Sequence, residues 1–333
     1  YNICMNESST IFDVIILGSG PSGLTAALYT SRAFLNTLVI AGNPPGGQLT
    51  ITTRVENFPG FPDGVLGTEF ISNARKQVEN NGAKLVDENV IKISGSFEEN
   101  FTVETDAGNI YKTRTIIIAT GSSAKWLGLE SEKKYIGKGV CACATCDGFF
   151  YKHRVVAVVG GGDSAMEEST FLTRFATKVY VIVRKGKKDL RASKYMQKKA
   201  FDDPKIEFIF NSVVKEVLGN DVVTGIKIAT KNQKDGVEVE EESTLQIDGL
   251  FVAIGHHPNT KFLEGLVELD EKGYVKMFEN HKTSKEGIFV SGDVHDHVYR
   301  QAISAAGYGC QAAIDVTRFL SEHGIETHVS SYQ

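Results

Sequence analysis

The chain has 333 residues, 41% of them hydrophobic and 23% charged, and its 36 basic against 41 acidic side chains give a formal net charge of −5 at pH 7. This length suggests about two domains, and the apolar fraction is too high for a disordered protein. No apolar run approaches the ~18 residues of a membrane-spanning helix, and basic residues concentrate only around 185–188, so neither a membrane nor a nucleic acid is expected as a partner. The first residues lack the pattern of a secretory signal, and we therefore expect a cytoplasmic protein.

The first element is a nucleotide-binding unit. A buried strand is predicted over 12–17, a helix over 24–34 and a second strand over 37–40. The turn between the first strand and the helix has the G-x-G-x-x-G spacing: Gly18, Gly20 and Gly23. Such a turn lets the backbone hold a pyrophosphate at the helix N-terminus, although a glycine turn without a ligand is the alternative. The acid that usually binds a ribose is missing after Ile40, which disfavours plain NAD here.

The next segments extend this first domain. Pro- and Gly-rich loops are predicted over 43–48 and 57–67, and an amphipathic helix near 68–81. Alternating patterns predict three further strands, near 90–93, 101–104 and 113–118.

A second nucleotide-binding unit begins about 140 residues after the first. A strand over 154–160 precedes a helix that runs to about 175, and a strand over 179–183 follows. Its turn fits G-x-G-x-x-A: Gly160, Gly162 and Ala165. Cations stand where an acid would bind a ribose 2′-hydroxyl, which favours a 2′-phosphate and hence NADP(H): Arg184 and Lys185, with Lys187, Lys188 and Arg191 nearby. A solvated basic loop is the alternative.

The last third completes both domains. Strands are predicted near 207–210, 213–218, 225–229, 249–254 and 287–293, a polar turn over 231–236, and a helix over 300–320. Because no linker separates two halves, we expect one α/β domain interrupted by another, with crossings near 119–121 and 253–255.

Five cysteines form an odd set, unlike a secreted disulfide framework: Cys4, Cys141, Cys143, Cys146 and Cys310. Cys143 and Cys146 form a C-x-x-C pair, which suits a redox-active dithiol, half a zinc site or inert thiols. No second pair of ligands has zinc spacing, so we expect no metal. Asp147 follows directly and is placed to exchange a proton with a thiol, with a helix N-cap or a turn residue as the alternative role. Cys310 is expected to be a core residue.

Two dinucleotide sites and a dithiol in one chain indicate a flavoprotein, with FAD in one site and the nicotinamide cofactor in the other. Together they predict a redox relay from nicotinamide to flavin to disulfide.

The order of Gly18-Ser-Gly-Pro, Cys143-Ala-Thr-Cys-Asp-Gly148 and Gly160-Gly-Gly-Asp-Ser-Ala165 resembles the low-molecular-weight thioredoxin reductases of bacteria, fungi and protists. The resemblance extends from Phe12 to about Leu320. It implies an α/β homodimer with two Rossmann-like, three-layer ββα domains, the second inserted into the first. The FAD-binding domain would comprise 1–122 and 254–333, and the NADPH-binding domain with the C-x-x-C pair would comprise 123–253.

The resemblance also implies roles for individual residues. The FAD-binding set is Gly18, Ser19, Gly20, Pro21, Ser22, Gly23, Gly47, Gln48, Leu49, Asn57, Val90, Ala119, Thr120, Gly121, Gly292, Asp293, Arg300, Gln301 and Ala302. The NADPH-binding set is Gly160, Gly162, Asp163, Ser164, Ala165, Arg184, Lys185 and Arg191. Cys146 would face the flavin, Cys143 would attack the disulfide of thioredoxin, and Asp147 would be the acid. Phe149 and Phe150 would hold thioredoxin or pack in the core.

Two departures from the family stand out. Two residues are inserted in the run from Arg184 to Arg191, which affects the choice between NADPH and NADH. Cys141 lies outside the matched pair and is expected to take no part in turnover.

The expected function is therefore NADPH-dependent reduction of thioredoxin in cell redox homeostasis. An NAD(P)H oxidase, the reductase of a peroxide-scavenging system and a non-enzymatic nucleotide sensor or scaffold are the alternatives.

Overall fold

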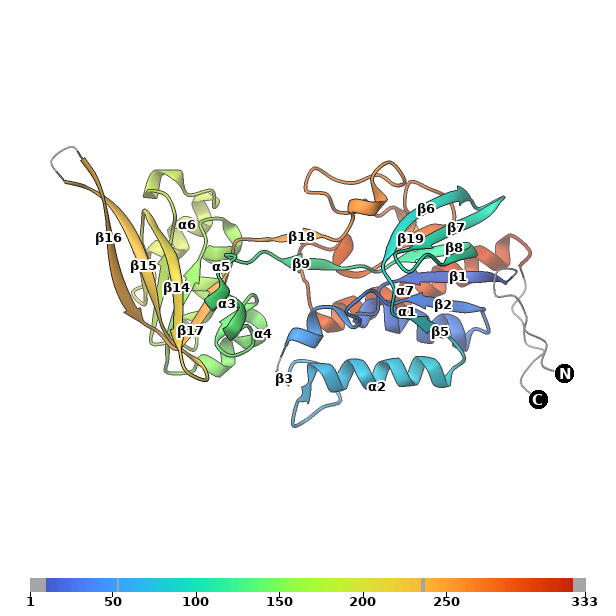
Figure 1. Cartoon of the computed structure of the whole chain (residues 1–333), viewed down its shortest axis with the longest axis horizontal. Helices are drawn as coiled ribbons and strands as arrows, with labels where there is room; N and C mark the ends of the chain where they lie inside the picture. Colours follow the sequence, from blue (N-terminus) through green and yellow to red (C-terminus); the bar gives the residue numbers. More distant parts are fainter. Residues whose placement is uncertain (1–9, 53, 235–236, 326–333) are drawn as a thin grey trace. The chain divides into compact units, whose positions relative to one another are not determined.

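The computed structural model describes residues 10–52, 54–234 and 237–325 and divides into two compact units (Figure 1). Unit 1 contains the described residues up to Ser123 and from His257, and unit 2 is Ala124–His256. The chain passes between them through β9 (Ser122–Ala124) and β18 (His256–Pro258), which pair as a two-stranded sheet. Cys4 lies outside the described residues.

Unit 1 is built on a seven-stranded sheet in which β1 occupies a central position. The order along the sheet is β5 (Lys84–Val86), β2 (Thr37–Ile40), β1 (Ile11–Leu17), β8 (Ile110–Ile118), β7 (Asn100–Thr105) and β6 (Val90–Ser96), with β19 (Ile288–Val290) also paired to β8. The pairings among β1, β2, β5, β8 and β19 are parallel, whereas β7 pairs antiparallel with both β6 and β8. Parallel strands buried on both faces read as continuous apolar runs, which is why β1 and β2 are evident in the sequence.

Three helices belong to this unit: α1 (Pro21–Arg32), α2 (Gly67–Asn80) and α7 (Ala302–Glu322). On one face of the sheet, Val14 and Ile16 of β1 share a core with apolar residues of α1 and α7. On the other face, Ile15 and Leu17 pack with residues of β8, β7 and the 263–294 segment. The helices α1 and α7 approach closely because Gly309 has no side chain. A Cβ there would lie 2.2 Å from the Ser22 carbonyl oxygen.

Short elements complete unit 1. They are β3 (Arg54–Val55), β4 (Val65–Leu66) and the 3-10 helices η2 (Gly47–Ile51), η5 (Lys261–Leu263), η6 (Glu279–His281) and η7 (Gly292–Val294).

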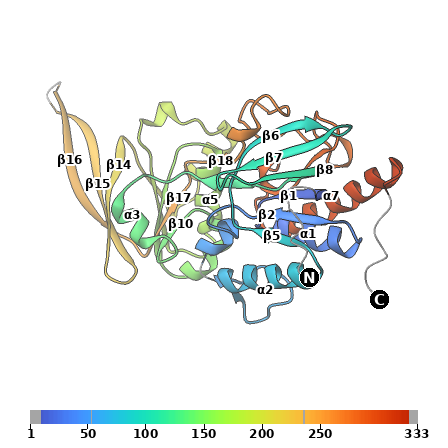
Figure 2. The same ribbon diagram turned by 45° about the vertical axis from the view of Figure 1, so that its right-hand side comes forward.

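Unit 2 contains a five-stranded parallel sheet and a three-stranded antiparallel sheet (Figure 2). The first has the order β10 (Val140–Cys141), β17 (Gly249–Val252), β11 (Val155–Val159), β12 (Lys178–Ile182) and β13 (Ile206–Ile209). The second is β14 (Ser212–Gly219), β15 (Val223–Lys234) and β16 (Val237–Gln246). The helices are α3 (Glu130–Tyr135), α4 (Ala144–Asp147), α5 (Asp163–Leu172), α6 (Lys194–Phe201) and the 3-10 helices η3 (Gly148–Tyr151) and η4 (Lys187–Asp189).

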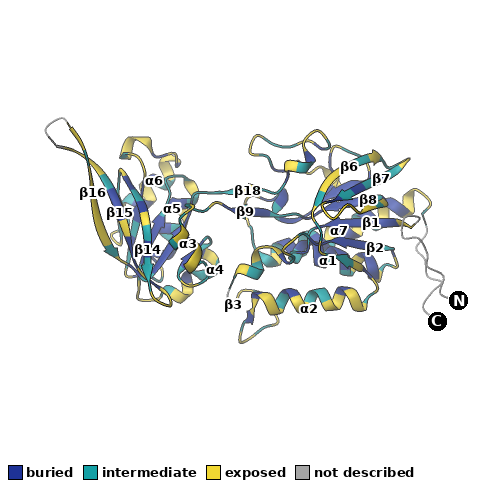
Figure 3. Cartoon of the chain, in the orientation of Figure 1, coloured by how far each residue is buried: buried dark blue, intermediate teal, exposed yellow. Residues whose placement is uncertain are grey.

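The predicted α/β class, with one Rossmann-like unit inserted into another, is confirmed. Three local predictions are wrong. Residues 231–234 continue β15 instead of turning, while residues 235–236 of the predicted turn lie outside the described residues. The helix predicted to run to about 175 ends at Leu172, and Cys310 is only half-buried. The strand β16 was not expected: it is mostly exposed, and four of its ten residues are glutamates (Figure 3).

Candidate functional site

The turn after β1 requires its glycines. Gly18 has φ +109°, and a Cβ there would lie 2.4 Å from the Ala119 carbonyl oxygen. A Cβ on Gly23 would lie 2.0 Å from the Gly18 carbonyl oxygen, so the start of α1 packs directly against the turn. Gly20, the N-cap of α1, has open space on its Cβ side, and Pro21 follows as the first helical residue. The helix N-terminus therefore presents its free amides beside an open, side-chain-free surface, which suits a pyrophosphate.

Two serines of this turn are structural. The buried Ser19 hydroxyl donates to the Ala41 carbonyl oxygen at 2.8 Å and accepts from the Gly46 amide at 2.7 Å, which fixes the loop before η2. Ser22 Oγ lies 2.6 Å from Ser291 Oγ, which joins α1 to the segment before η7. These hydrogen bonds hold both buried side chains in place within unit 1.

Asp293 carries a buried carboxyl oxygen. Among the described residues its Oδ1 is buried without a hydrogen-bond partner. Burial and the negative charge of Asp296 raise the pKa of Asp293 to about 7, although the Arg300 guanidinium lowers it in part. A ligand hydroxyl donating to this oxygen would remove the cost of its desolvation, so the residue fits the ribitol chain of a flavin.

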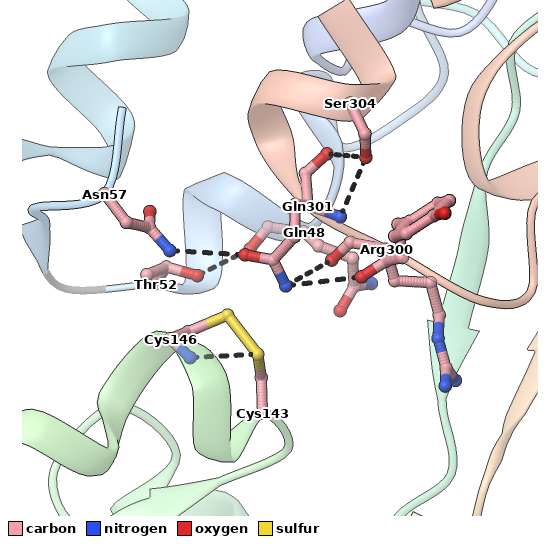
Figure 4. Close-up of a disulfide and its surroundings, with 9 residues drawn as sticks. Gln48, Thr52, Asn57, Cys143, Cys146, Arg300, Gln301 and Ser304 are labelled. Atoms are coloured by element: carbon pink, nitrogen blue, oxygen red, sulfur yellow. Dashed lines mark hydrogen bonds between the residues drawn. A yellow bond between two sulfur atoms is a disulfide. The ribbon is translucent and has the colours of Figure 1, made fainter. Parts of the chain in front are cut away.

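Polar side chains around the N-terminus of α7 form a connected group (Figure 4). Asn57 donates to the Gln301 Oε1 at 3.2 Å, and Gln301 forms a capping box with Ser304 at the start of α7. Arg300 has φ +48°, a strained backbone position for a residue with a side chain. Gln48 is exposed in η2.

The other predicted flavin residues lie in the same unit. A Cβ on Gly47 would come 3.5 Å from the Gly20 Cα, so η2 reaches the glycine turn of α1. Thr120 donates to the Asn259 carbonyl oxygen at 2.9 Å, and the Asn259 side chain donates back to the Thr120 carbonyl oxygen at 2.9 Å. The remainder are buried or half-buried: Leu49, Val90, Ala119, Gly121, Gly292 and Ala302. The predicted site does not include the Thr120–Asn259 and Ser22–Ser291 contacts, because no local sequence pattern indicates them.

The second glycine turn repeats the geometry of the first. A Cβ on Gly160 would lie 2.4 Å from the Ala253 carbonyl oxygen and 2.7 Å from the Ala165 Cβ, while Gly162, the N-cap of α5, faces open space. Ser164 lies half-buried in the first turn of α5. The Asp163 side chain accepts from the Ser193 amide at 2.8 Å, so this carboxylate holds the following loop in place.

The basic loop is tied to the glycine turn. The Arg191 amide donates to the Gly161 carbonyl oxygen at 2.9 Å, and the side chains of Arg184, Lys185 and Arg191 are exposed. Lys187 differs from these cations, because its Nζ lies 4.2 Å from the centre of the Phe201 ring. The two glycine turns thus differ in charge, and only the second has a cluster of exposed cations to receive a 2′-phosphate.

Cys143 and Cys146 are joined in a disulfide (Figure 4). Cys143 is the N-cap of α4, and the Cys146 amide donates to Cys143 Sγ at 3.2 Å. After reduction, this amide would stabilise a Cys143 thiolate. Both cysteines are half-buried. The described residues include no group of three or more His, Cys, Asp or Glu side chains arranged for a metal ion.

Asp147 ends α4 and occupies the N-cap position of η3, but its side chain makes no capping hydrogen bond there. Burial raises the pKa of the Asp147 carboxyl, which a hydrogen bond from Cys141 lowers in part. A carboxyl whose pKa is moved toward neutrality is better suited to give a proton near pH 7. Phe149 and Phe150 are exposed, with 63% and 43% of their surface accessible, which contradicts simple core packing.

The comparisons with known proteins agree with this geometry. The chain matches the family described as Pyridine nucleotide-disulphide oxidoreductase over residues 12–309. It is 49% identical to a thioredoxin reductase of Streptomyces coelicolor, over 94% of this chain and 95% of that protein. Its fold is similar to those of a Giardia duodenalis thioredoxin reductase (40% identity, TM-score 0.85, 94% of this chain and 100% of the other) and a Streptococcus pyogenes thioredoxin reductase (37%, 0.87, 94% and 99%).

Proposed function

The chain belongs to the pyridine nucleotide-disulphide oxidoreductases, and within them to the thioredoxin reductases, and from this we propose that it carries electrons from NADPH through FAD and the Cys143–Cys146 pair to oxidised thioredoxin. The observation that carries the proposal is the Cys143–Cys146 disulfide next to a carboxyl of raised pKa, in a chain with two glycine turns of different charge.

FAD belongs to unit 1 in this proposal. The amides after Gly20 would bind its pyrophosphate and Asp293 Oδ1 would accept from its ribitol, while the group around Gln48, Asn57 and Gln301 would lie near the ring. When bound, the flavin supplies two-electron exchange between a nicotinamide and a disulfide.

The sulfur chemistry belongs to unit 2. Two electrons break the S–S bond and leave two thiolates, and the proton of the Asp147 carboxyl converts one of them to a thiol. The Cys143 thiolate then attacks the disulfide of thioredoxin, and Cys146 attacks the resulting mixed disulfide, which releases reduced thioredoxin and restores the Cys143–Cys146 bond. The exposed Phe149 and Phe150 offer an aromatic surface for the protein substrate.

The direct test combines the protein, NADPH and oxidised thioredoxin and follows NADPH absorbance. Consumption that depends on thioredoxin is expected. Consumption that continues without thioredoxin and uses oxygen would instead favour an NAD(P)H oxidase. No bleaching of the flavin on anaerobic addition of NADPH would favour a nucleotide sensor or scaffold.

The basic loop provides a prediction about cofactor choice. Changing both Arg184 and Arg191 to alanine should raise the KM for NADPH by about tenfold or more, because each removes a charged hydrogen bond to the 2′-phosphate. The KM for NADH, which lacks this phosphate, should change little. Steady-state kinetics with both nucleotides measure the difference.

Lys187→Ala is the matched control, because this exposed cation of the same loop lies over Phe201. It should keep the KM for NADPH within about twofold. An equal rise in the KM for both nucleotides in the Arg184/Arg191 variant would show that the loop does not select the phosphate.

The proposal also includes a homodimer, taken from the resemblance, and a cytoplasmic location, expected from the first residues of the sequence. Light scattering on the purified protein tests the first. Every helix in the described part of the chain is too short or too polar to span a bilayer.

A further inference from the structure

The aromatic surface of Phe149 and Phe150 extends to the end of α5. The Phe149 ring lies edge-on to that of Phe175, with centroids 6.2 Å apart, and the Phe175 ring lies 5.5 Å from that of Phe171. Phe149 and Phe150 also meet edge-on, at 6.4 Å. Two phenylalanines of η3 and two at or just after the end of α5 therefore form one cluster, and its most exposed member is Phe149.

This aromatic cluster is joined to the turn that carries the cysteine pair. The helix α4, which contains Cys146, packs against α5. Gly148, the next residue but one, also lies against α5, since a Cβ there would be 3.4 Å from Phe171 Cε1. After η3, the His153 amide donates to the Phe175 carbonyl oxygen at 3.0 Å. Both ends of η3 are thus fixed to the end of α5.

Exposed cations lie next to two members of the cluster. The Arg174 Cζ is 5.2 Å from the centre of the Phe171 ring, which keeps the guanidinium beside the aromatic surface while the side chain stays exposed. Lys152 follows η3 directly and is also exposed, and its amide donates to the Phe149 carbonyl oxygen at 3.4 Å.

These two cations differ from others nearby because neither makes an ion pair with any residue in the described part of the chain. Arg154, by contrast, pairs with Asp248, and Lys178 pairs with Glu207. Aromatic and arginine side chains are enriched in protein-binding surfaces and supply much of their affinity. Cations without a carboxylate of their own favour a partner that brings one.

We propose that the end of α5 is part of the surface that binds the protein substrate, where Phe175 positions Phe149, and Arg174 and Lys152 receive carboxylates that thioredoxin carries beside its disulfide. The inference rests on the proposed reduction of thioredoxin and adds the chemistry of the partner: an apolar surface with acidic side chains at its edge. The chain has a net charge of −5, so these cations are a local exception that attracts such a partner.

A charge series at Arg174 tests this chemistry. Flavin-loaded protein is assayed with excess NADPH and varied oxidised thioredoxin. The kcat/KM for thioredoxin should stay within about twofold of wild type in Arg174→Lys, fall about threefold in Arg174→Ala and fall about tenfold in Arg174→Glu, because a charge at the edge of an interface attracts or repels the partner. The differences should shrink to within about twofold at an ionic strength of about 0.5 M, where such charges are screened.

Two controls separate this effect from a loss of structure. Lys227→Ala removes an exposed cation of β15, whose sheet packs on the face of the five-stranded sheet opposite to α5, and it should leave kcat/KM unchanged. Anaerobic NADPH should bleach the flavin at the same rate in every variant. Phe175→Leu keeps an apolar side chain but removes the ring beside Phe149, so it should lower kcat/KM about threefold at both ionic strengths.

Equal kcat/KM in wild type and Arg174→Glu at low ionic strength would overturn the inference. A higher value in Arg174→Glu would also overturn it, because the partner would then present a cation here. Absence of thioredoxin turnover in the wild type would instead overturn the proposed function. The fluorescence anisotropy of dye-labelled thioredoxin mixed with the oxidised variants would still decide the inference, since binding must weaken from Arg174→Lys to Arg174→Ala to Arg174→Glu.

Discussion

Replacing Cys143 or Cys146 with serine is expected to abolish thioredoxin-dependent oxidation of NADPH while the flavin stays bound. Neither variant can form the Cys143–Cys146 disulfide, so unit 2 loses its only two-electron carrier among the described residues. A serine hydroxyl is far less nucleophilic than a thiolate, and the loss should reach about a thousandfold or more. NADPH absorbance in the presence of oxidised thioredoxin measures the turnover, and the visible spectrum of the purified variants measures bound flavin.

The control for this experiment is Cys310→Ser, a half-buried free cysteine in α7 of unit 1. It should turn over at the wild-type rate. In the serine variants of the pair, anaerobic NADPH should still bleach the flavin absorbance, because unit 1 and both glycine turns are unchanged. Thioredoxin reduction that persists in Cys146→Ser would mean that the electrons follow another route.

The parts of the fold that the sequence predicts well are those with a local signal. The strand predicted over 12–17 is Ile11–Leu17, and the one over 37–40 is Thr37–Ile40. Both are apolar, β-branched runs buried on two faces. The glycine turns are equally evident. Each requires glycine at a point where a Cβ would lie within about 3 Å of another backbone atom.

The strand β16 shows where this signal fails. Four of its ten residues are glutamates and most of the strand is exposed, and the alternation of valine and glutamate over 237–240 breaks at Glu241, so the period-2 signal is short. The strand forms because it pairs with β15 over ten residues, Lys234↔Val237 to Gly225↔Gln246, and because ion pairs such as Lys231–Glu238 cross the two strands. A short stretch of a single sequence does not indicate the stability that pairing with a partner strand supplies.

The same reasoning applies to the candidate site. The C-x-x-C pair and the glycine turns were evident because their residues are close together in the chain. The contacts that complete the site join distant residues, as in Ser22–Ser291, which are 269 positions apart. Cys141 was expected to take no part in turnover, and only the folded chain shows that its thiol lies 3.4 Å from the Tyr151 hydroxyl.

Changing Asp293 to asparagine should weaken flavin binding and at the same time stabilise the flavin-free protein at alkaline pH. The folded pKa is about 7, against ~3.9 for an unfolded aspartate, so the folded state binds this proton more tightly. The contribution of Asp293 to the free energy of unfolding is fully present below pH 4, where the carboxyl is protonated, and it is lost as pH rises to 7. Above pH 7 this loss is at most about 4 kcal/mol. Asparagine avoids this cost. Thermal unfolding of flavin-free protein at pH 5 and pH 8 measures it, and quenching of flavin fluorescence measures affinity.

The two effects should separate in a matched variant, Asp296→Asn. Its amide oxygen can still accept from the Val298 and Tyr299 amides, as Asp296 does now at 2.8 and 3.2 Å. Removing its negative charge lowers the pKa of Asp293 and so reduces the alkaline instability, while Asp293 keeps its oxygen for the ribitol.

Wild-type affinity for flavin should rise between pH 6 and pH 8, since an ionised carboxylate is the stronger acceptor. If Asp293→Asn instead unfolds at or below the wild-type temperature at pH 8, this carboxylate is not charged and desolvated in the flavin-free fold. If Asp293→Asn binds flavin with unchanged affinity, the Asp293 Oδ1 has a partner other than the flavin.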